Sequence, residues 1–461
     1  MNNSLVISNE WLFNKYNVPG SYYTAYPPTG VWSKGFDHYH YIGALKEAFS
    51  KRLDLPLQLY IHFPFCKTQC WYCQCIQVIT KSETKIKKSV EYLTKEIDLL
   101  INFFNSIGVA PNFKEIHLGG GSPSYMGEEE FDMLINKLLS FININNLSEF
   151  AIEIDPRTVS KEKMKYYHGK GINRISFGIQ DLDPVVQGAI NRIQPIELVE
   201  ELLETRGLFS CVNFDLIYGL PLQTRESFKS TIDKVIKLSP DRIDLSIFGY
   251  RPDIFKHNRL IEKSTLPSLI DSKLMWDDSR INLEAHGYKR IGMDHFAKCT
   301  DALTIAKKNK TLFRNPLGYS PGRFHDTVSI GPSGMTKIAD YYFQNTYMLP
   351  DYYSAIDEDL LPVFRGYRLS EDDLIRRDII NQLMTYDQLD FSELEQKYVI
   401  NFNQYFRREI DLLSTFVKEG ILDVSDNMAT VTPLGSFFLR NICMAFDNLR
   451  KDYRHNAESV A

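Results

Sequence analysis

The chain has 461 residues, 44% of them hydrophobic and 24% charged, which is the composition of an ordinary globular protein with a sizeable core. A formal net charge of −5 gives no general attraction to nucleic acid or to an anionic membrane. The N-terminus lacks the basic and apolar regions of a signal peptide, and no apolar run approaches the roughly 20 residues that span a bilayer. We therefore expect a cytoplasmic protein that binds neither nucleic acid nor membrane.

The first 55 residues are interrupted by proline and glycine, which predicts an extended arm with one helix over about 38–51. Tyrosines are dense in this arm, for example at Tyr22, Tyr23 and Tyr26. Because such rings are unusual on a solvated tail, we expect residues 1–55 to pack over the active site of the main domain.

From residue 57 onward, apolar runs alternate with segments of helical periodicity. The expected strands are 57–63, 115–118, 150–154, 174–179, 213–218 and 242–248. The expected helices are 83–105, 128–141, 197–206, 224–237 and 268–285. Six such units predict an α/β domain over 56–365 with a parallel sheet and right-handed crossovers. Ligands of such folds bind at the carboxyl ends of the strands.

The last part of the chain, 366–461, has a different pattern. It predicts helices at about 370–385, from 390 and at 403–419, then a hairpin over 421–432 and a helix over 433–451. This order resembles a winged helix. Because its charges are mixed and no basic face stands out, a lid or docking domain is favoured over DNA binding.

Four of the seven cysteines follow the first strand within ten residues: Cys66, Cys70, Cys73 and Cys75. Three thiolates on one short loop can hold three irons of a [4Fe–4S] cluster and leave the fourth iron open. Zinc is disfavoured because no second ligand pair follows. A thioredoxin-like pair of Cys70 and Cys73 would leave Cys66 and Cys75 without a role. Disulfides are disfavoured because there is no secretion signal. A cluster with an open iron is the favoured interpretation.

The string from Tyr60 to Cys75, Y-I-H-F-P-F-C-x3-C-x-Y-C-x-C, resembles the radical S-adenosylmethionine (SAM) superfamily, and within it the oxygen-independent coproporphyrinogen III oxidase family. The resemblance implies a partial, open (β/α)6 barrel. It also implies that Cys66, Cys70 and Cys73 hold the cluster, whereas Cys75 belongs to the string without being a ligand. The open iron then binds SAM, and an electron from the cluster releases a 5′-deoxyadenosyl radical.

Other unusual residues stand at strand ends. Gly119, Gly120 and Gly121 let a backbone approach a ligand closely, although a tight turn explains them equally well. Glu153 lies in a buried strand, where a carboxylate needs a partner such as Arg157 or another base.

Two more polar side chains, Gln180 and Asp215, follow the same pattern at strand ends. Arg192 can bind a carboxylate with two parallel bonds, or form an ion pair at a helix end. Tyr60 either faces a cation with its ring or belongs to the core.

The resemblance gives these residues roles. It implies that Gly119, Gly120, Gly121 and Ser122 meet the amino group of SAM, Glu153 its ribose and Arg192 its carboxylate. It implies a second SAM beside Gln180 and Ile217, with Asp215 and Tyr250 among the cofactor-binding residues. Tyr60 and Gln180 are the expected catalytic residues.

By the same resemblance, the substrate is a porphyrinogen whose propionate loses hydrogen and CO2 to become a vinyl group. The expected partners are a reduced flavodoxin or ferredoxin and no second subunit, so that the protein is a monomer. The sequence departs from the family around 20–27, 249–252, 318–326 and 331–336. Tyr250 there is large enough to crowd a second SAM, and Arg251 and Arg323 are candidate carboxylate anchors.

These departures leave two alternatives open. One is a related enzyme that uses the same radical on another substrate, in methyl transfer or haem breakdown. The other is a haem- or cluster-binding protein without turnover.

Overall fold

The structure, a computed structural model, describes residues 3–322, 326–450 and 458–459. These residues fall into two compact units. The larger comprises Ser33–Pro267 and Phe324–Arg368, and the smaller comprises Met1–Trp32, Ser268–Arg323 and Leu369–Ala461. The domain boundaries expected from the sequence, at 1–55, 56–365 and 366–461, stay a prediction. Among the described helices, none combines the length and apolar character that crossing a bilayer requires.

Six parallel strands form the centre of the larger unit, and they are neighbours in the order in which they follow along the chain. They are β2 (Pro56–Phe63), β5 (Asn112–Gly120), β6 (Glu149–Ile154), β7 (Arg174–Gln180), β8 (Cys211–Tyr218) and β9 (Arg242–Ile247). Most of their side chains are buried, as parallel strands require when their faces are covered. The six strands predicted from the alternation are thereby confirmed.

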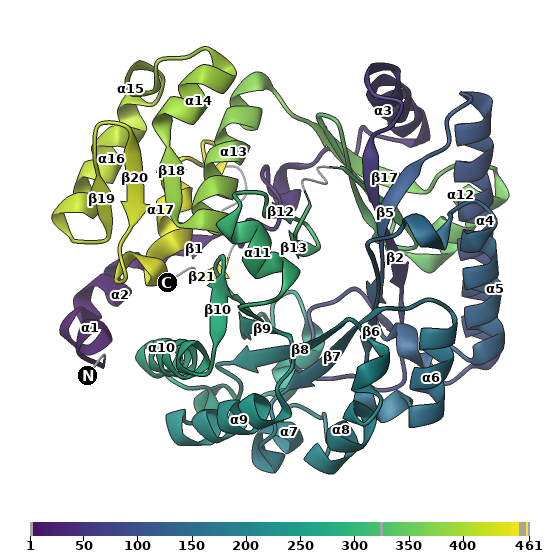
Figure 1. Ribbon diagram of the computed structural model, residues 1–461, viewed down its shortest axis with the longest axis horizontal. Coiled ribbons are helices and arrows are strands. Elements are labelled where there is room, and N and C mark those ends of the chain that lie inside the picture. Colours follow the sequence, from purple (N-terminus) through teal and green to yellow (C-terminus); the bar gives the residue numbers. More distant parts are fainter. Residues whose placement is uncertain (1–2, 323–325, 451–457, 460–461) are drawn as a thin grey trace. The chain divides into compact units, whose positions relative to one another are not determined.

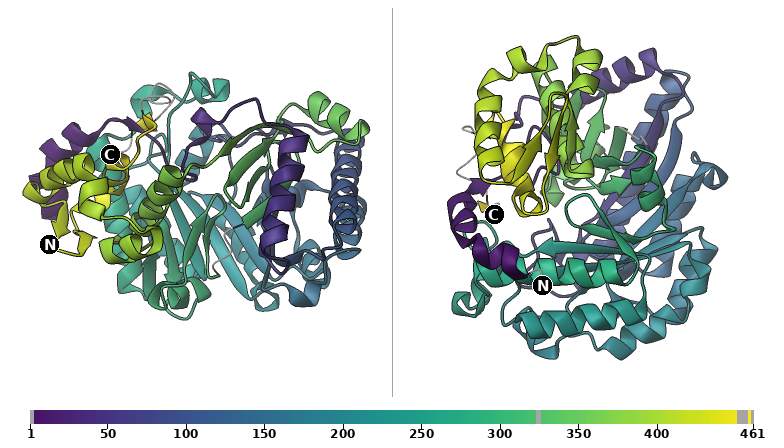
Figure 2. Two further views of the ribbon diagram at one scale, coloured as in Figure 1. Left: turned by 90° about the horizontal axis from the view of Figure 1, so that it is seen from above. Right: turned by 60° about the vertical axis from the view of Figure 1, so that its left-hand side comes forward.

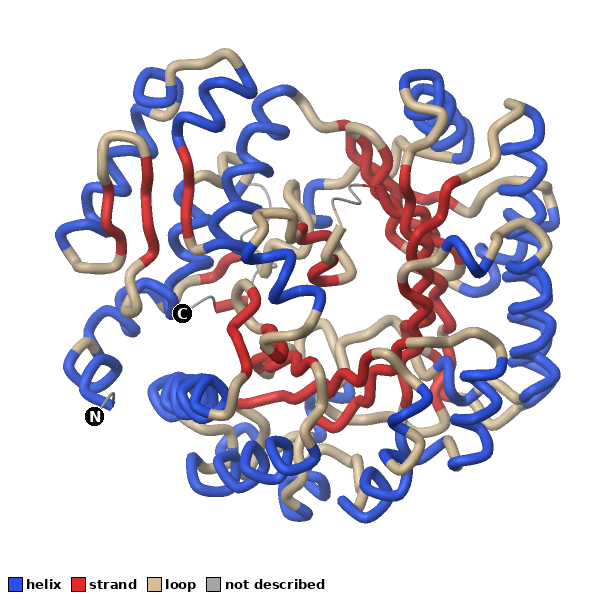
Figure 3. Tube along the Cα trace, in the orientation of Figure 1, coloured by secondary structure: helices blue, strands red, loops and turns tan. Residues whose placement is uncertain are grey.

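Helices cover the outer side of this curved sheet (Figures 1 and 3). They are α4 (Glu83–Ser106), α5 (Glu128–Leu139), α6 (Lys161–Gly169), α7 (Pro184–Ala189), α8 (Ile196–Leu203) and α9 (Arg225–Leu238). The sequence did not predict α6 and α7. Both are short, and α6 buries only Met164 and Tyr167, so its apolar periodicity is weak.

The sheet continues past β2 with strands that were not predicted. β14 (Asp326–Ile330) pairs parallel to β2, and β15 (Met335–Ile338), β16 (Tyr341–Asn345) and β17 (Val363–Arg368) follow antiparallel. Both edges of β2 are therefore occupied, by β5 and β14, and the six-unit barrel stays open as the resemblance implied. The larger unit also contains α3 (His38–Lys51), at the predicted position, and α12 (Leu349–Asp357).

A buried carboxylate ties α4 to this added part of the sheet. Glu96 accepts hydrogen bonds from Gly331 N at 2.7 Å, from Asn345 Nδ2 at 2.8 Å and from Tyr352 Oη at 2.6 Å. Burial outweighs these bonds and raises the pKa of Glu96 from 4.5 to about 7. The folded chain therefore holds this proton more tightly than the unfolded chain does.

We expect the free energy of unfolding to fall as the pH rises from about 4.5 to about 7, with Glu96 contributing about 3 kcal/mol to this loss. The sign follows because the native state binds the extra proton throughout this window. Urea titrations at several pH values should show that Glu96→Gln, which stays neutral, reduces the slope. Glu91→Gln, at an exposed position of the same helix, should leave it unchanged. An unaltered slope in Glu96→Gln would contradict this explanation.

The smaller unit begins with a departure from the predicted extended arm, because residues 3–16 form α1 (Asn3–Ser8) and α2 (Glu10–Tyr16). Phe13 in α2 is fully buried, with its ring centroid 5.5 Å from that of Phe437 and 4.8 Å from that of Phe438. Helices this short depend on tertiary packing more than on propensity, so six or seven residues of sequence give little sign of them.

The middle of the smaller unit contains the predicted helix, α10 (Leu269–Ala285), and two hairpins that were not predicted. The hairpins pair β10 (Tyr288–Ile291) with β11 (His295–Lys298), and β12 (Phe313–Asn315) with β13 (Gly318–Ser320). Between them lies α11 (Ala302–Lys308), and β1 (Pro19–Gly20) pairs with β21 (Glu458–Ser459).

The C-terminal part of the smaller unit has the predicted order of helices and hairpin (Figures 1 and 2). Its elements are α13 (Glu371–Tyr386), β18 (Gln388–Asp390), α14 (Phe391–Tyr398), α15 (Phe402–Tyr405), α16 (Arg407–Lys418), β19 (Leu422–Val424), β20 (Met428–Val431) and α17 (Leu439–Ala445). Three details differ. β18 adds a third strand beside β20, and the single helix expected over 403–419 is divided into α15 and α16. The last helix begins later than predicted because a 3-10 turn over Gly435–Phe438 precedes it.

Candidate active site

The four clustered cysteines lie on a loop at the carboxyl end of β2, where ligands of parallel α/β folds bind. Within this loop β3 (Phe65–Cys66) pairs with β4 (Val78–Ile79). Val78 N donates to Pro64 O at 2.7 Å, and Thr80 N donates to Cys66 O at 3.1 Å. The loop is thus folded back on itself by its own backbone.

Residues far along the chain hold the outer part of this loop. His257 Nε2 lies 2.5 Å from Cys73 O, and Asn258 Nδ2 donates to Trp71 O at 2.6 Å. Sequence analysis missed both residues, because nothing in a lone histidine or asparagine 180 positions away marks it as a partner of the loop.

Two arginines approach the sulfur of Cys70. Arg157 Nη2 and Arg192 Nη1 each lie 3.6 Å from Cys70 Sγ. Both also contact the Asp155 carboxylate, at 2.7 Å from Arg157 and 3.4 Å from Arg192. Arg192 Nε is buried with no hydrogen-bond partner among the described residues, so this N–H group is available to a ligand.

The thiols of Cys66 and Cys73 are held in the neutral form by their surroundings. Burial raises the pKa of Cys66 to about 12, although Ser122 Oγ, 3.6 Å from its sulfur, opposes the rise. The hydrogen bond with Cys75 and then burial raise the pKa of Cys73 well above its usual value. A metal that binds these sulfurs must therefore displace their protons.

The three glycines at the end of β5 lie where no side chain fits. A Cβ on Gly119 would come within 2.6 Å of Glu153 Oε1, and one on Gly121 within 2.7 Å of Phe65 O. Gly120 has φ of +110°, in the region that favours glycine. Tight packing of β5 against β2, the cysteine loop and β6 accounts for all three. The same packing leaves bare backbone at the rim.

Glu153 has its partner in His117 and not in Arg157. His117 Nε2 lies 2.9 Å from Glu153 Oε1, and Gly120 N donates to Oε2 at 3.2 Å. Burial alone would raise the pKa of Glu153, but the hydrogen bond and charge of His117 outweigh it and lower the pKa. Glu153 is therefore ionised at neutral pH. His117 alternates with apolar residues in β5, and this pattern was the available sign of a buried partner.

Tyr60 joins the Glu153 group. Its ring stacks on His117 with centroids 5.8 Å apart, and its hydroxyl lies 3.2 Å from His62 Nδ1. Burial raises the pKa of Tyr60 well above its usual value, so the phenol stays neutral.

Gln180 and Arg192 meet at Gly178. Arg192 Nη2 donates to Gly178 O at 2.6 Å. A Cβ on Gly178 would lie 2.9 Å from Gln180 Nε2 and 3.0 Å from Arg192 Nη2. Gln180 has φ of +66°, an uncommon value for a residue other than glycine and one often found at functional positions. The structure therefore brings these two predicted residues together.

The remaining predicted residues lie further along the rim. Asp215 accepts from Ser176 Oγ at 3.0 Å and from Asn213 Nδ2 at 2.6 Å, which fixes it between β7 and β8. Ile217 packs on the same small apolar cluster as Tyr72 of the cysteine loop.

Tyr250 has its ring beside Phe248, with centroids 6.4 Å apart. Within the part of the chain that the structure describes, no hydrogen bond or ion pair joins Tyr250 to the groups around Cys70 or Glu153. Arg251 already contacts Asp253, at 3.3 Å, and Arg323 lies outside the described residues.

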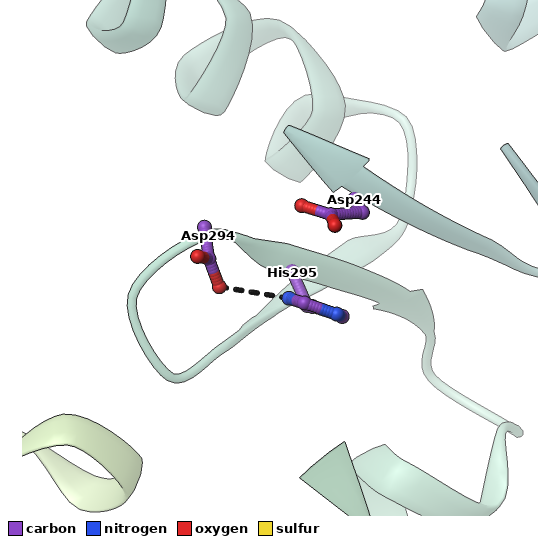
Figure 4. A group of neighbouring side chains, drawn as sticks. All are labelled: Asp244, Asp294 and His295. Carbon is purple, nitrogen blue, oxygen red and sulfur yellow. Dashed lines mark hydrogen bonds and ion pairs between the residues drawn. The ribbon is translucent and has the colours of Figure 1, made fainter. Parts of the chain in front are cut away.

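The smaller unit contains an acidic residue next to a histidine at the turn between β10 and β11. There His295 Nδ1 lies 2.8 Å from an Asp294 carboxylate oxygen (Figure 4). Burial opposes ionisation of Asp294, but the neighbouring His295, Arg314 and Arg440 lower its pKa. The carboxyl group of Asp294 is therefore ionised at neutral pH.

Comparison with known proteins covers almost the whole chain. The family model described as "Radical SAM superfamily" matches residues 60–235, and the one described as "HemN C-terminal domain" matches 369–438. The oxygen-independent coproporphyrinogen III oxidase of Helicobacter pylori is 37% identical over 97% of this chain and 98% of its own. The protein of the same name from Escherichia coli is 35% identical over 95% and 94%.

A solved structure agrees with these sequence relatives. The coproporphyrinogen III oxidase (HemN) from Escherichia coli, described as a radical SAM enzyme, superposes with a TM-score of 0.87. It covers 93% of this chain and 97% of its own at 35% identity. The chain therefore belongs to the oxygen-independent coproporphyrinogen III oxidase family of radical SAM proteins, which work with a [4Fe–4S] cluster and SAM.

Proposed function

We propose that this protein catalyses the oxygen-independent oxidative decarboxylation of coproporphyrinogen III, turning propionate side chains into vinyl groups on the way to haem. One observation carries the proposal. The loop with Cys66, Cys70 and Cys73 stands at the carboxyl end of β2, beside the buried Arg192 and the partly buried Arg157, in a chain that matches these oxidases over almost its whole length. The proposal includes a cytoplasmic monomer that receives electrons from flavodoxin or ferredoxin.

The residues present fit the cluster. Cys66, Cys70 and Cys73 offer three sulfur ligands on one loop. Thiolate ligands bring negative charge, and the guanidinium groups of Arg157 and Arg192 at Cys70 compensate part of it. Cys75 is exposed at the edge of the loop, which supports its exclusion from the ligand set.

The residues also fit one SAM. Arg192, with its unpaired Nε, is suited to the carboxylate. The rim of Gly119, Gly120, Gly121 and Ser122 offers bare backbone to the amino group, and ionised Glu153 can accept from the ribose hydroxyls. The ring of Tyr60 is suited to the sulfonium. For a second SAM we propose Gln180, Ile217, Asp215 and Tyr250.

When bound, the cluster and SAM would supply the radical chemistry that removes a hydrogen atom from the β-carbon of a propionate, and the propionate would then lose CO2 and pass one electron to an external acceptor to become a vinyl group. The chain's own residues prepare this step. His117 keeps Glu153 ionised and oriented, and Asp155 holds both arginines against Cys70. Because these groups are largely buried, their charges act in a medium of low dielectric constant.

The test is anaerobic reconstitution with iron and sulfide, followed by reduction in the presence of SAM and coproporphyrinogen III. We expect 5′-deoxyadenosine together with vinyl products and CO2. If SAM is cleaved and no vinyl group forms, the substrate is another molecule. Absence of SAM cleavage by a fully loaded cluster would refute radical chemistry and favour a binding protein.

A further inference from the structure

A mixed basic and apolar surface lies on the solvent side of the cysteine loop. We call it the loop surface and define it as Lys67, Ile76, Val78, Ile79, Lys81 and Lys85. The three apolar side chains are 38%, 37% and 40% exposed, and the three lysines are exposed as well. Adjacent exposed apolar residues ringed by charge are typical of sites that bind a protein partner.

The loop surface is joined directly to the residues that hold the cluster. β4, which carries Val78 and Ile79, pairs with the strand that contains Cys66. The Thr80 N to Cys66 O bond of 3.1 Å brings the neighbours Lys67 and Lys81 to the same edge. A partner bound here would be separated from the cluster by little more than one layer of this loop.

The charge of this segment is opposite to that of the chain. Residues 67–88 contain five lysines and one acidic residue, a balance of +4 in a chain whose formal net charge is −5. Lys87 pairs with Glu129 at 2.7 Å. Lys67, Lys81 and Lys85 make no ion pair with any residue that the structure describes. Three lysine charges thus face the solvent uncompensated, around an apolar centre.

We propose that the loop surface is the docking site of the electron donor, a small acidic one-electron carrier protein. This inference rests on the proposed function, which requires an external electron at the cluster. The step at the interface is a single electron transfer: the donor is oxidised by one electron and the cluster is reduced by one, with no bond or proton change. Electron-transfer encounters use small interfaces, and opposite charges speed their formation.

The experiment compares Lys81→Glu/Lys85→Glu with wild type. Neither lysine contacts a cysteine, and a glutamate in the first turn of α4 suits the helix dipole, so the fold should be kept. Stopped-flow spectroscopy would follow bleaching of the cluster by flavodoxin hydroquinone at low ionic strength. We expect reduction to slow by about tenfold or more, and the salt dependence of the wild-type rate to be largely lost.

Two controls make the result specific. Reduction by dithionite, a small reagent that needs no docking site, should be unchanged in the variant. Lys165→Glu/Lys237→Glu makes the same change in net charge at exposed positions of α6 and α9, and it should keep the wild-type rate with flavodoxin. Calorimetric titration of flavodoxin, which needs no SAM chemistry, should show weaker binding only for the variant at the loop surface.

Equal rates and equal flavodoxin affinities for wild type and Lys81→Glu/Lys85→Glu would overturn the proposal. An equal loss in the Lys165→Glu/Lys237→Glu control would also overturn it, because overall charge would then suffice. These outcomes differ from failure of the proposed function, in which a dithionite-reduced wild-type cluster cleaves no SAM or yields no vinyl product.

Discussion

Cys70→Ala should abolish the cluster absorbance at ~400 nm in the anaerobically reconstituted protein and, with it, all cleavage of SAM. Cys70 is the cysteine with two guanidinium groups at 3.6 Å from its sulfur. Its loss leaves two thiolates, which cannot hold three irons of the cluster, and it places two arginines beside an alanine. Iron and sulfide analysis, with visible absorption, measures the first effect, and chromatographic assay of 5′-deoxyadenosine measures the second.

Cys75→Ala is the matched control, because it removes a cysteine two residues from the proposed ligands. Alanine removes the Cys75 thiol that meets Cys73 but retains the backbone N–H that contacts Cys73 Sγ at 3.4 Å. The variant should therefore keep most of the cluster absorbance and of SAM cleavage. Equal loss in both variants would show that four thiolates cap the cluster and that no iron is open to SAM.

The parallel sheet could be predicted from the sequence because each of its strands has a local signal. Each of the six strands is an apolar run that ends in a turn, and such runs are recognisable one at a time. β14 is different: Asp326–Ile330 is short and mixes Thr and Ser with apolar residues. It becomes a strand because the free edge of β2, more than 260 positions earlier in the sequence, is available to it.

The candidate site also contains residues that a local pattern in the sequence marks and residues that depend on partners far away in the sequence. The cysteines could be predicted because their spacing is itself the signal. Arg192 and Glu153 could be predicted from the motifs around them. His117, Asp155 and His257 act through partners that only the fold brings near: Glu153, Arg192 and the backbone of Cys73. Such pairings depend on the register of neighbouring strands and on loop packing. No periodicity or spacing in the sequence records them.

Arg192→Lys should raise the KM for SAM by on the order of 100-fold while the cluster still assembles, because two charge-assisted hydrogen bonds are worth roughly 3 kcal/mol together. Arg192 is 6% exposed, and its guanidinium group is already fixed by Gly178 O and Asp155. Lysine keeps the positive charge but has no planar fork to meet a carboxylate. The measurement is the dependence of 5′-deoxyadenosine formation on SAM concentration, together with the ~400 nm absorbance as a check on the cluster.

Arg157→Lys is the matched control, since Arg157 stands at the same distance from Cys70 Sγ and also pairs with Asp155. It lacks the orphaned buried donor that marks Arg192, so its KM for SAM should change far less. If both variants shift KM alike, charge at the cluster and not carboxylate binding explains the effect. If Arg192→Lys binds SAM as wild type does, another residue must hold the carboxylate, because a single ammonium cannot replace two parallel bonds in a site this buried.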